Sequence, residues 1–458
     1  MEEPLLKKII IPVVFLLQAC ASQPAPDPAP EPVVVTPPTP PATTTATKPS
    51  PPFAAVKPAV AGKPKPAPTT DLWLRIRKGF AISDLEGKLV KQKTAQYAAS
   101  PEYLGRIIGR SKLYLFHIVG EIEKRGLPTE LALLPMVESA FNPMAYSRAH
   151  ASGLWQFIPG TGKRFELEQN SFYDGRRDIV DSTNAALDYL TKLHEMHGDW
   201  HLALASYNWG ENAVKRAVAR NKAAKKKTDY ASLRMPKETR HYIPKLQALE
   251  NIIANPQAYG VDLDKIPDQP YFTAITDAPD IDVHLAAKLA DMPVEDFIAL
   301  NPGFSRPVIR ASASRRIILP ADKVAAFYDN LDQYDEGALV SWQVIQLESG
   351  EKLEAIAQRY DISLAELRRV NGIGSRATKL PKELVVPMNG EARATLAELP
   401  LMYASPIPSD GPARAVHVVK NGDTLSSIAR RYRVSVANLK NWNQTGKFLQ
   451  VGQKIYIR

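Results

Sequence analysis

Residues 137–165 read VESAFNPMAYSRAHASGLWQFIPGTGKRF, and an apolar run that begins at Leu131 leads into them. A helix over Leu131 to Glu138 would place Leu131 and Leu134 on the same face as Glu138. Desolvation on this apolar surface and the negative end of the helix dipole would both raise the pKa of the carboxyl group. A carboxyl group that keeps its proton near neutral pH can act as a general acid, whereas a buried Glu paired with Arg148, Arg164 or another base would be structural.

The residues after Glu138 resemble the lytic transglycosylase signature, in which Glu-Ser is followed by Phe, Pro, Ala and Ser and then by Gly-Leu-(Met or Trp)-Gln and Pro-x-Thr. The matching positions are Glu138, Ser139, Phe141, Pro143, Ala145, Ser147, Gly153, Leu154, Trp155, Gln156, Pro159 and Thr161. Two later segments also resemble the family, ALASYNWG through Tyr207, Asn208 and Gly210 and KETRHYIPKL through Glu238, Thr239 and Tyr242. His150 and Trp209 depart from the pattern, because Gly and a small residue are common at their positions.

The resemblance implies that Glu138 acts as an acid and then as a base on a glycan. Glu138 would protonate the bond between N-acetylmuramic acid and N-acetylglucosamine of peptidoglycan and then take the proton of the muramyl C6 hydroxyl, which leaves a 1,6-anhydro end. The substrate would supply the nucleophile, in keeping with the absence of another Asp or Glu between Glu138 and Gln156. Acid-base chemistry on a neutral sugar implies neither a metal nor an organic cofactor.

Polar side chains of the matched segments are candidates for binding the sugar. By resemblance, Ser147 and Gln156 would hydrogen-bond it, and Tyr207 would hold Glu138 or the developing oxocarbenium region in place. Asn208 is a further candidate for contact with the substrate, and its position also suits a role in shaping the turn after its helix.

The aromatic candidates each have a structural alternative. Trp155 and Trp209 have flat apolar faces of the kind that stack on pyranose rings, and the same faces suit ordinary core packing. Tyr242 would either bind substrate or serve packing and hydrogen bonding inside the domain. The sequence does not choose between these roles.

Two other functions stay open beside transglycosylation. The chain could be a hydrolase of the lysozyme kind, or a wall-binding lipoprotein that keeps a lysozyme-like fold without catalysis. Product chemistry separates the three, because hydrolysis leaves a reducing muramic acid, transglycosylation leaves an anhydro end, and a scaffold releases nothing.

The first 20 residues, MEEPLLKKIIIPVVFLLQAC, have the dimensions of a signal peptide. Their apolar run is too short to span a bilayer of about 30 Å as a helix, and a short uncleaved anchor is the alternative. The ending Leu-Gln-Ala-Cys resembles a bacterial lipobox, which implies that residues 1–19 are removed and Cys20 is lipidated. No Asp follows Cys20 directly, which favours an outer-membrane lipoprotein facing the periplasm of a diderm bacterium. Residues 20–70 are rich in Pro and Ala and predict an extended tether.

Composition limits the partners without choosing one. The chain has 458 residues, a formal net charge of +10 and 39 prolines. Positive charge suits an anionic partner, but no recognisable nucleic-acid module accompanies it, and the basic run at 222–227 predicts a solvated loop. The single cysteine excludes an intrachain disulfide. We therefore expect peptidoglycan strands and, through a lipid on Cys20, a membrane as partners; the sequence identifies no protein partner.

Residues 71–260 have the periodicity of an all-helical domain, and the resemblance implies that this domain, with its signature over 130–210, is lysozyme-like. Helix start and stop signals predict one helix from the Pro101 region to just before Gly126. Further helices are predicted at about 128–140, 179–197, 200–209 and 239–254.

The rest of the chain repeats a module three times. The segments IDVHLAAKLADMPVEDFIALN, EKLEAIAQRYDISLAELRRVN and DTLSSIARRYRVSVANLKNWN start at Ile281, Glu351 and Asp423. Each predicts two short helices that end at an Asn, and flanking strand-like pieces give the order strand, helix, helix, strand, an α+β unit. The modules, at 270–322, 340–388 and 414–458, resemble LysM modules, which bind glycans that contain N-acetylglucosamine. The resemblance implies glycan binding by the second and third, whereas the first lacks the Gly-Asp-Thr turn and could be structural only.

Overall fold

The structure is a computed structural model. It describes residues 70–276, 278–310, 316–348, 350–374, 377, 380–388, 390, 392, 405–406, 415–420, 422–432, 434, 436, 439, 443 and 449–457. The predicted signal peptide, the lipidation site Cys20 and residues 20–69 of the predicted tether lie outside the described residues. Among the described helices, none combines the length and the apolar character needed to cross a membrane.

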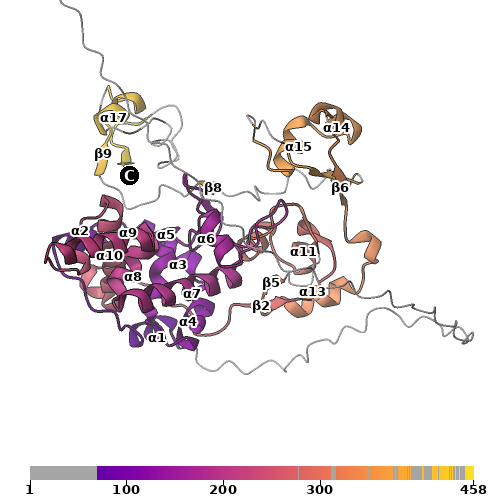
Figure 1. The fold of residues 1–458 in the computed structure, drawn as a ribbon. Coiled ribbons are helices and arrows are strands. Elements are labelled where there is room, and N and C mark those ends of the chain that lie inside the picture. The colour runs from indigo at the N-terminus through magenta and orange to yellow at the C-terminus, as the bar shows by residue number, and fades with distance from the viewer. Residues whose placement is uncertain are drawn as a thin grey trace, which may run out of the picture. The chain divides into compact units, whose positions relative to one another are not determined.

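The region after residue 70 forms a helical domain (Figure 1). Long helices α7 and α8 pack on each other, and α10 packs along α2 and α8. Leu and Ile side chains from these helices share one buried core with Trp73 and Trp155. The elements of the domain are α1 Leu72–Lys78, α2 Lys88–Ala98, α3 Pro101–Ser111, α4 Leu115–Lys124, η1 Thr129–Leu133, α5 Leu134–Glu138, β1 Ala145–Tyr146, α6 Pro159–Arg164, α7 Ile179–His197, α8 Trp200–Trp209, α9 Glu211–Ala223, η2 Tyr230–Ser232, α10 Lys237–Ala254 and η3 Pro256–Tyr259.

Capping residues determine the ends of the two helices whose bounds the sequence predicted correctly. The predicted helices at 179–197 and 200–209 are confirmed as α7 and α8. The Asp178 carboxylate accepts a hydrogen bond from the Asp181 N–H at the start of α7, and Asp199 caps α8 in the same way. Gly198 ends α7 in the left-handed conformation that favours glycine. The predicted helix near 239–254 is confirmed as α10, which begins two residues earlier.

Two segments that were predicted as single helices are each divided into two elements in the structure. The single helix predicted from Pro101 to Gly126 is divided into α3 and α4, because the chain turns at 112–114 and buries Tyr114. The helix predicted over 128–140 is a 3-10 helix, η1, followed by the five-residue α5. Pro135 explains the second break, since its ring would clash with the carbonyl of residue 131 in a continuous α-helix. Helix α9 was not predicted, and it ends within the basic run at 222–227.

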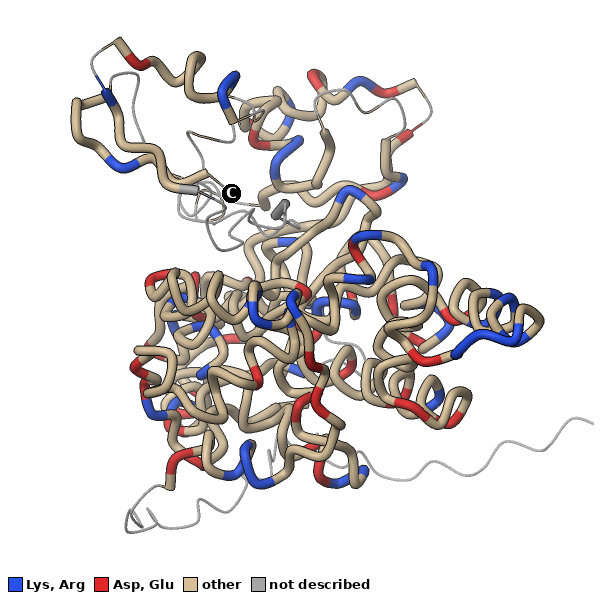
Figure 2. Tube along the Cα trace, turned by 90° about the vertical axis from the view of Figure 1, so that its left-hand side faces the viewer, with Lys and Arg blue, Asp and Glu red and all other residues tan. Residues whose placement is uncertain are grey.

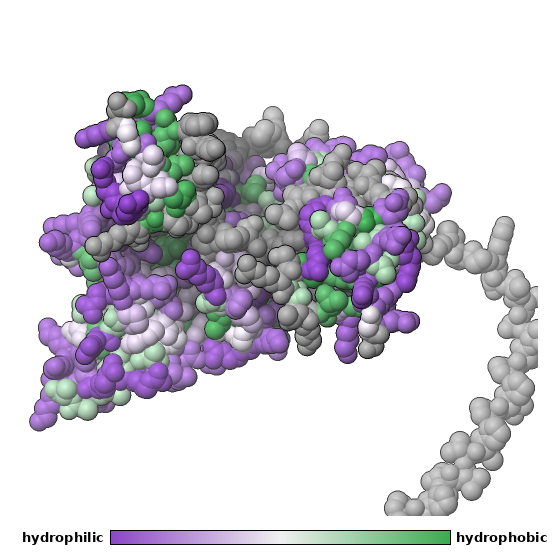
Figure 3. Space-filling view, turned by 90° about the horizontal axis from the view of Figure 1, so that it is seen from above, coloured by the Kyte–Doolittle hydropathy of each residue, from purple (hydrophilic) through white to green (hydrophobic). Residues whose placement is uncertain are grey.

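Charge is mixed over the surface of the described chain. Figure 2 shows Lys and Arg interspersed with Asp and Glu along the helical domain. Lys225, Lys226 and Lys227 are exposed beyond the end of α9, as the predicted solvated loop requires, whereas residues 222–223 of the basic run are still helical. In the view of Figure 3, hydrophilic residues cover most of the visible described surface and the hydrophobic patches are small.

The modules have the predicted order strand, helix, helix, strand, with an antiparallel strand pair in each (Figure 1). In the third module the second predicted helix falls largely outside the described residues. The first module also contains a second strand pair and an added helix, α13. The module elements are β2 Phe272–Ile275, β3 Ile281–Asp282, α11 Val283–Leu289, α12 Val294–Leu300, β4 Val308–Ile309, β5 Ile317–Pro320, α13 Val324–Leu331, η4 Glu336–Ala338, β6 Trp342–Gln346, α14 Leu353–Arg359, α15 Leu364–Val370, β7 Glu383–Pro387, β9 Ala415–Val418, α17 Leu425–Tyr432 and β10 Lys454–Ile457. The short strand β8 Ser405–Pro406 lies between the second and third modules in the chain and pairs in parallel with β1.

The Asn at the end of each repeat has the same structural role. Asn371 donates its amide to the Leu367 carbonyl at 3.0 Å and the Val385 carbonyl at 2.8 Å, and its oxygen accepts from the Val385 N–H at 2.7 Å. Asn301 and Asn443 make the same three hydrogen bonds in the other modules. One side chain thereby ties the helical segment to the last strand, which explains why Asn recurs.

We expect Asn371→Ala to destabilise the second module by about 2–4 kcal/mol, because it leaves an N–H and two carbonyls without their side-chain partner. Hydrogen exchange of the β6 and β7 amides in the whole chain measures this loss. The control is Gln346→Ala, which removes one exposed hydrogen bond to Glu383 and should change protection by less than about 0.5 kcal/mol. Equal effects of the two substitutions would show that Asn371 is not a structural tie.

Candidate active site

Glu138 is the last residue of α5 and opens into a cleft of about 530 Å³. The walls come from α5, the loop after it, α6, the α8–α9 junction and α10. The lining residues are Val137, Glu138, Ser147, Ala149, Ala151, Gln156, Phe157, Ile158, Thr161, Arg164, Tyr189, Tyr207, Asn208, Trp209, Gly210, Glu211, Glu238, Tyr242 and Lys245. The structure therefore brings together segments that lie up to about a hundred residues apart along the chain.

The surroundings of Glu138 favour the protonated form of its carboxyl group. Burial raises the pKa of Glu138 to about 7, against the opposing effects of the Tyr242 hydroxyl and the Lys245 ammonium group. This upward shift through desolvation is the one predicted from the apolar run before Glu138. The structural alternative was a pairing with Arg148, Arg164 or another base. Arg164 binds Glu211 instead at 2.7 Å, and Arg148 is exposed, so neither arginine supports it.

The hydroxyl that touches Glu138 belongs to Tyr242. From the middle of α10, Tyr242 donates a hydrogen bond to Oε1 of Glu138. Tyr207, which by resemblance would hold either Glu138 or the developing oxocarbenium region, donates to the carbonyl of Trp155 at 2.8 Å. Both tyrosines line the cleft, so the correction concerns which of them contacts the acid. From the sequence, Tyr242 was expected either to bind substrate or to serve packing and hydrogen bonding, and a contact with Glu138 was not predicted.

Ser147 and Gln156 lie in the cleft on the loop that follows β1. Ser147 Oγ accepts a hydrogen bond from the Ala151 N–H at 3.0 Å. Gln156 has a left-handed backbone with φ of 52°, and its amide donates to the Gly153 carbonyl at 2.8 Å. The Gln156 Oε1 is buried and has no hydrogen-bond partner in the described part of the chain. These contacts shape the loop and leave one acceptor beside the cleft.

The predicted stacking role of Trp155 is wrong. Its side chain is fully buried, with the indole N–H donating to Thr183 Oγ1 at 3.0 Å, so neither face can meet a sugar ring. Trp209 lines the cleft and is only partly buried. Asn208 also lines the cleft, and its side-chain oxygen accepts from Thr239 Oγ1 at 2.8 Å. This bond ties the end of α8 to α10.

His150, one of the two departures from the signature, has φ of 62°. Glycine adopts this left-handed conformation at least cost, which explains why the family commonly has Gly there. His is among the residues that adopt it more readily than most. Its Nδ1 lies 2.6 Å from the Tyr146 hydroxyl.

Sequence reasoning missed a polar cluster that lines the cleft. Glu211 begins α9 and accepts hydrogen bonds from Tyr189 at 2.7 Å and Arg164 at 2.7 Å. Burial opposes ionisation, but these two donors lower the pKa of Glu211 to about 2, so it is a carboxylate at neutral pH. Glu238 lines the same cleft and is exposed. Glu211 directly follows the matched segment that ends at Gly210, which was the available signal.

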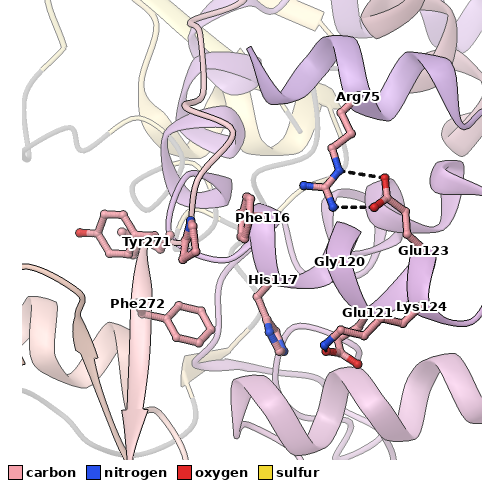
Figure 4. Close-up of a pocket in the computed structure, with 11 residues that line it drawn as sticks. Arg75, Phe116, His117, Gly120, Glu121, Glu123, Lys124, Tyr271 and Phe272 are labelled. Carbon is pink, nitrogen blue, oxygen red and sulfur yellow. Dashed lines mark hydrogen bonds and ion pairs between the residues drawn. The ribbon is translucent and has the colours of Figure 1, made fainter. Parts of the chain in front are cut away.

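A second cavity of about 530 Å³ lies between α1, α4 and residues 270–272 (Figure 4). Its acidic groups are already paired, since Arg75 binds Glu123 and Lys124 binds Glu121, whereas the buried Nε2 of His117 has no hydrogen-bond partner among the described residues. None of the signature residues lines it. The cavity around Glu138 is therefore the candidate active site.

Family models divide the chain in a consistent way. The transglycosylase SLT domain matches residues 118–230, and the LysM domain matches 346–386 and 417–458. The model described as lytic transglycosylase MltD, LysM-like domain, matches residues 272–336. Fold and cleft together define a lysozyme-like transglycosylase domain followed by LysM modules, the architecture predicted from the sequence.

Curated relatives narrow the class. The chain is 32% identical over 402 residues to membrane-bound lytic murein transglycosylase D of Escherichia coli, covering 85% of this chain and 86% of that protein. It is 28% identical over 166 residues to membrane-bound lytic murein transglycosylase C of Haemophilus influenzae, covering 32% and 46%. An autolysin of Enterococcus faecalis is 34% identical over 113 residues, covering 24% and 15%. The chain belongs to the membrane-bound lytic murein transglycosylase D family.

Proposed function

We propose that this lytic transglycosylase cleaves the β-1,4 bond between N-acetylmuramic acid and N-acetylglucosamine of peptidoglycan and leaves 1,6-anhydromuramic acid ends. The observation that carries the proposal is the partly buried Glu138 carboxyl group, whose pKa of about 7 keeps a large protonated fraction at neutral pH. It opens into a cleft large enough for sugar rings. Membership of the transglycosylase D family supports the same reaction class.

The mechanism uses Glu138 twice. Its proton passes to the glycosidic oxygen as the bond to the muramyl C1 breaks, and the N-acetylglucosamine end leaves as an alcohol. The muramyl C6 hydroxyl then attacks C1, and Glu138, now a carboxylate, takes the hydroxyl proton and returns to its starting state. Attack from within the sugar requires no bound water and has the entropic advantage of an oriented nucleophile. The Tyr242 hydroxyl stabilises the carboxylate between the two transfers.

Other cleft residues are proposed to bind the sugar. Gln156 lines the cleft, and its Oε1, which has no hydrogen-bond partner among the described residues, would accept a hydrogen bond from a sugar hydroxyl or amide. Ser147, Asn208 and Tyr207 line the cleft with further polar groups, and the partly buried Trp209 has an apolar ring that suits a pyranose face. Tyr242 would act on the sugar only through Glu138.

Hydrolysis is the second candidate, and a specific observation favours it. Glu211 and Glu238 line the cleft with Glu138, so a second carboxylate is available to a two-carboxylate mechanism. Glu211 is held ionised by Arg164 and Tyr189, which would suit a base that activates water. Both of its oxygens already accept hydrogen bonds, and this favours a structural role for Glu211 and the single-acid mechanism.

The remaining parts of the chain would deliver the enzyme to its substrate. The second and third LysM modules are proposed to bind glycan strands, since the LysM family model matches both. Lipidation of Cys20 would anchor the chain in the outer membrane with the enzyme in the periplasm, and the Pro- and Ala-rich residues 20–70 would be the tether. Labelling of cells with an alkynyl fatty acid tests the anchor, because Cys20→Ala should abolish incorporation into the protein.

Product analysis tests the reaction. The soluble chain, residues 71–458, is incubated with purified peptidoglycan, and released muropeptides are identified by mass spectrometry. Anhydro-ended muropeptides are expected. Reducing-ended products would assign the chain to the hydrolases, and the absence of release while the protein still sediments with the wall would leave only a binding role.

The pH dependence of the rate should report Glu138. A general acid is active only while protonated, so kcat should be high below pH 7 and fall as pH rises through about 7. The Tyr242 hydroxyl lowers the pKa of Glu138, so Tyr242→Phe should raise that pKa and move the fall in kcat to higher pH. Loss of a hydrogen bond to a charged group should also reduce kcat by about tenfold or more.

Tyr207→Phe is the matched control for the midpoint of this pH profile. Its hydroxyl bonds the Trp155 carbonyl, so its loss should leave the midpoint unchanged even if the rate falls. An unchanged midpoint in Tyr242→Phe would contradict the assignment of the fall to Glu138.

A further inference from the structure

The loop of residues 145–157, here called the cleft loop, needs outside support. It carries Ser147 and Gln156 into the cleft, yet beyond the two residues of β1 it has no regular secondary structure. His150, Gly153 and Gln156 have positive φ values of 62°, 83° and 52°. Non-glycine residues held in this region cost about 1 kcal/mol or more each and persist only when surrounding contacts hold them.

Arg176 supplies that support from behind the loop. The guanidinium Nη1 donates to the His150 carbonyl at 2.6 Å and to the Phe157 carbonyl at 3.2 Å, so one group spans the second half of the cleft loop. Arg176 is only 6% exposed. Its backbone carbonyl lies directly against Gly153, where an added Cβ would come within 2.1 Å of it. Arg176 thus contacts the loop through both side chain and backbone.

The orientation of Arg176 is set by Asp174. Arg176 Nε donates to Asp174 Oδ1 at 2.9 Å and Nη2 donates to Oδ2 at 2.8 Å, a two-point pairing. The planar guanidinium matches a carboxylate in this geometry and keeps its third nitrogen for the loop carbonyls. A lysine has one nitrogen and cannot meet both sets of acceptors.

Asp174 is in turn held by the LysM-like module. The Asp174 N–H donates to the Gly303 carbonyl at 2.8 Å, and the Ser305 N–H donates to the Phe172 carbonyl at 2.8 Å. Tyr173 packs its ring on Phe304, with centroids 5.4 Å apart. A strand-like pairing therefore joins the segment before Arg176 to the first module.

The first module also shares the core of the helical domain. Leu300 and Ile318 of the module belong to the main hydrophobic cluster of that domain. The Tyr114 hydroxyl donates to the Ala299 carbonyl at 2.8 Å, and Arg316 pairs with Asp181 of α7. A module fixed in this way can transmit its position to the cleft.

We propose that Arg176 is a positioning residue for the cleft and that the LysM-like module at 272–336 is a brace that holds it in place. The module fixes residues 172–174, Asp174 orients Arg176, and Arg176 holds the cleft loop with Ser147 and Gln156. The effect on rate rests on the proposed function, whereas the effect on loop order does not. The degenerate repeat would thus serve the active site rather than bind glycan.

The test replaces Arg176 by Lys, which keeps the charge but not the link between Asp174 and the loop. At a temperature where the variant is folded, kcat on peptidoglycan should fall by about tenfold or more, because small displacements of binding groups cost that much. Hydrogen exchange of the 147–157 amides should accelerate about tenfold or more, while α7 and α8 keep their protection. The matched control, Arg75→Lys, disturbs a similar two-point pairing with Glu123 at the second cavity (Figure 4) and should change neither readout.

A second variant acts from the module. Gly303→Ala would bring a Cβ within 2.7 Å of the Tyr173 ring and push residues 172–174 away. The same local loss of protection in the cleft loop is expected, with the β2 and β5 amides still protected. This variant decides the question if Arg176→Lys does not fold.

The outcomes separate the brace from the proposed reaction. Parent-like protection and kcat in both variants would overturn the brace, and so would equal loss of protection in the loop, α7 and α8, which indicates general destabilisation. The exchange measurement needs no substrate. An inactive parent chain would therefore refute the proposed function while the exchange data still test the brace.

Discussion

Glu138→Gln should reduce the rate of peptidoglycan cleavage by about a thousandfold or more, the largest effect expected of any single substitution in this chain. Gln has nearly the same shape and keeps a hydrogen-bond acceptor for Tyr242, but it can neither donate the proton to the glycosidic oxygen nor take one from the C6 hydroxyl. General acid-base catalysis contributes about 10²–10⁴-fold, and Glu138 would serve in both steps. Initial rates of muropeptide release at pH 6 measure the loss.

The stability of the Glu138→Gln variant controls for loss of rate through unfolding. The folded pKa of Glu138, about 7, lies above its ordinary value of 4.5, so its stabilising contribution is complete below pH 4.5 and is lost as pH rises through 7. Above pH 7 the ionised, partly buried group opposes folding by about 3 kcal/mol, which Gln avoids. The variant should therefore unfold at the same temperature as the parent or higher at pH 8. A residual rate near that of the parent would remove Glu138 from the mechanism.

Gly153→Ala should be the most destabilising substitution in the cleft loop, by about 3 kcal/mol or more. Two physical effects combine at this position. Gly153 has φ of 83°, where a side chain costs about 1 kcal/mol, and its Cβ would lie 2.1 Å from the Arg176 carbonyl oxygen. Because the obstacle is backbone, no side-chain rotation can relieve it. Chemical denaturation and cleavage rate should both show the loss.

Gly198→Ala is the matched control for the steric effect expected of Gly153→Ala. Gly198 has φ of 64° at the end of α7, and an added Cβ would meet no atom within 4 Å. It should therefore lose only about 1 kcal/mol, the conformational part of the effect. If Gly153→Ala lost no more than Gly198→Ala, close packing on Arg176 would not explain the glycine in the signature.

Local sequence accounted for the elements whose causes lie close together in the chain. The caps at Asp178 and Asp199 and the terminal Gly198 were sufficient to predict α7 and α8, because each acts within four residues of a helix end. The apolar run before Glu138 was sufficient to predict a raised pKa. Pro135 was also visible in the sequence, and the break it imposes between η1 and α5 was an avoidable error.

Contacts between distant segments could not be predicted in the same way. Tyr242 lies 104 residues from Glu138, and only the packing of α10 beside α5 shows that its hydroxyl, rather than that of Tyr207, meets the acid. Trp155 was a reasonable stacking residue by type, yet the core encloses it. Glu211 directly follows a matched segment, but only the structure shows that the start of α9 lines the cleft.

The sequence by itself determined the family, the helical domain, the order of strands and helices in the modules, and the acid that opens into the cleft. Short-range capping, hydrophobic periodicity and residue spacing carry that information along the chain. Only the tertiary structure decided which groups surround Glu138 and how the first module reaches the cleft loop through Asp174 and Arg176. These contacts depend on side-chain directions and close packing between elements far apart in sequence, which no local pattern encodes.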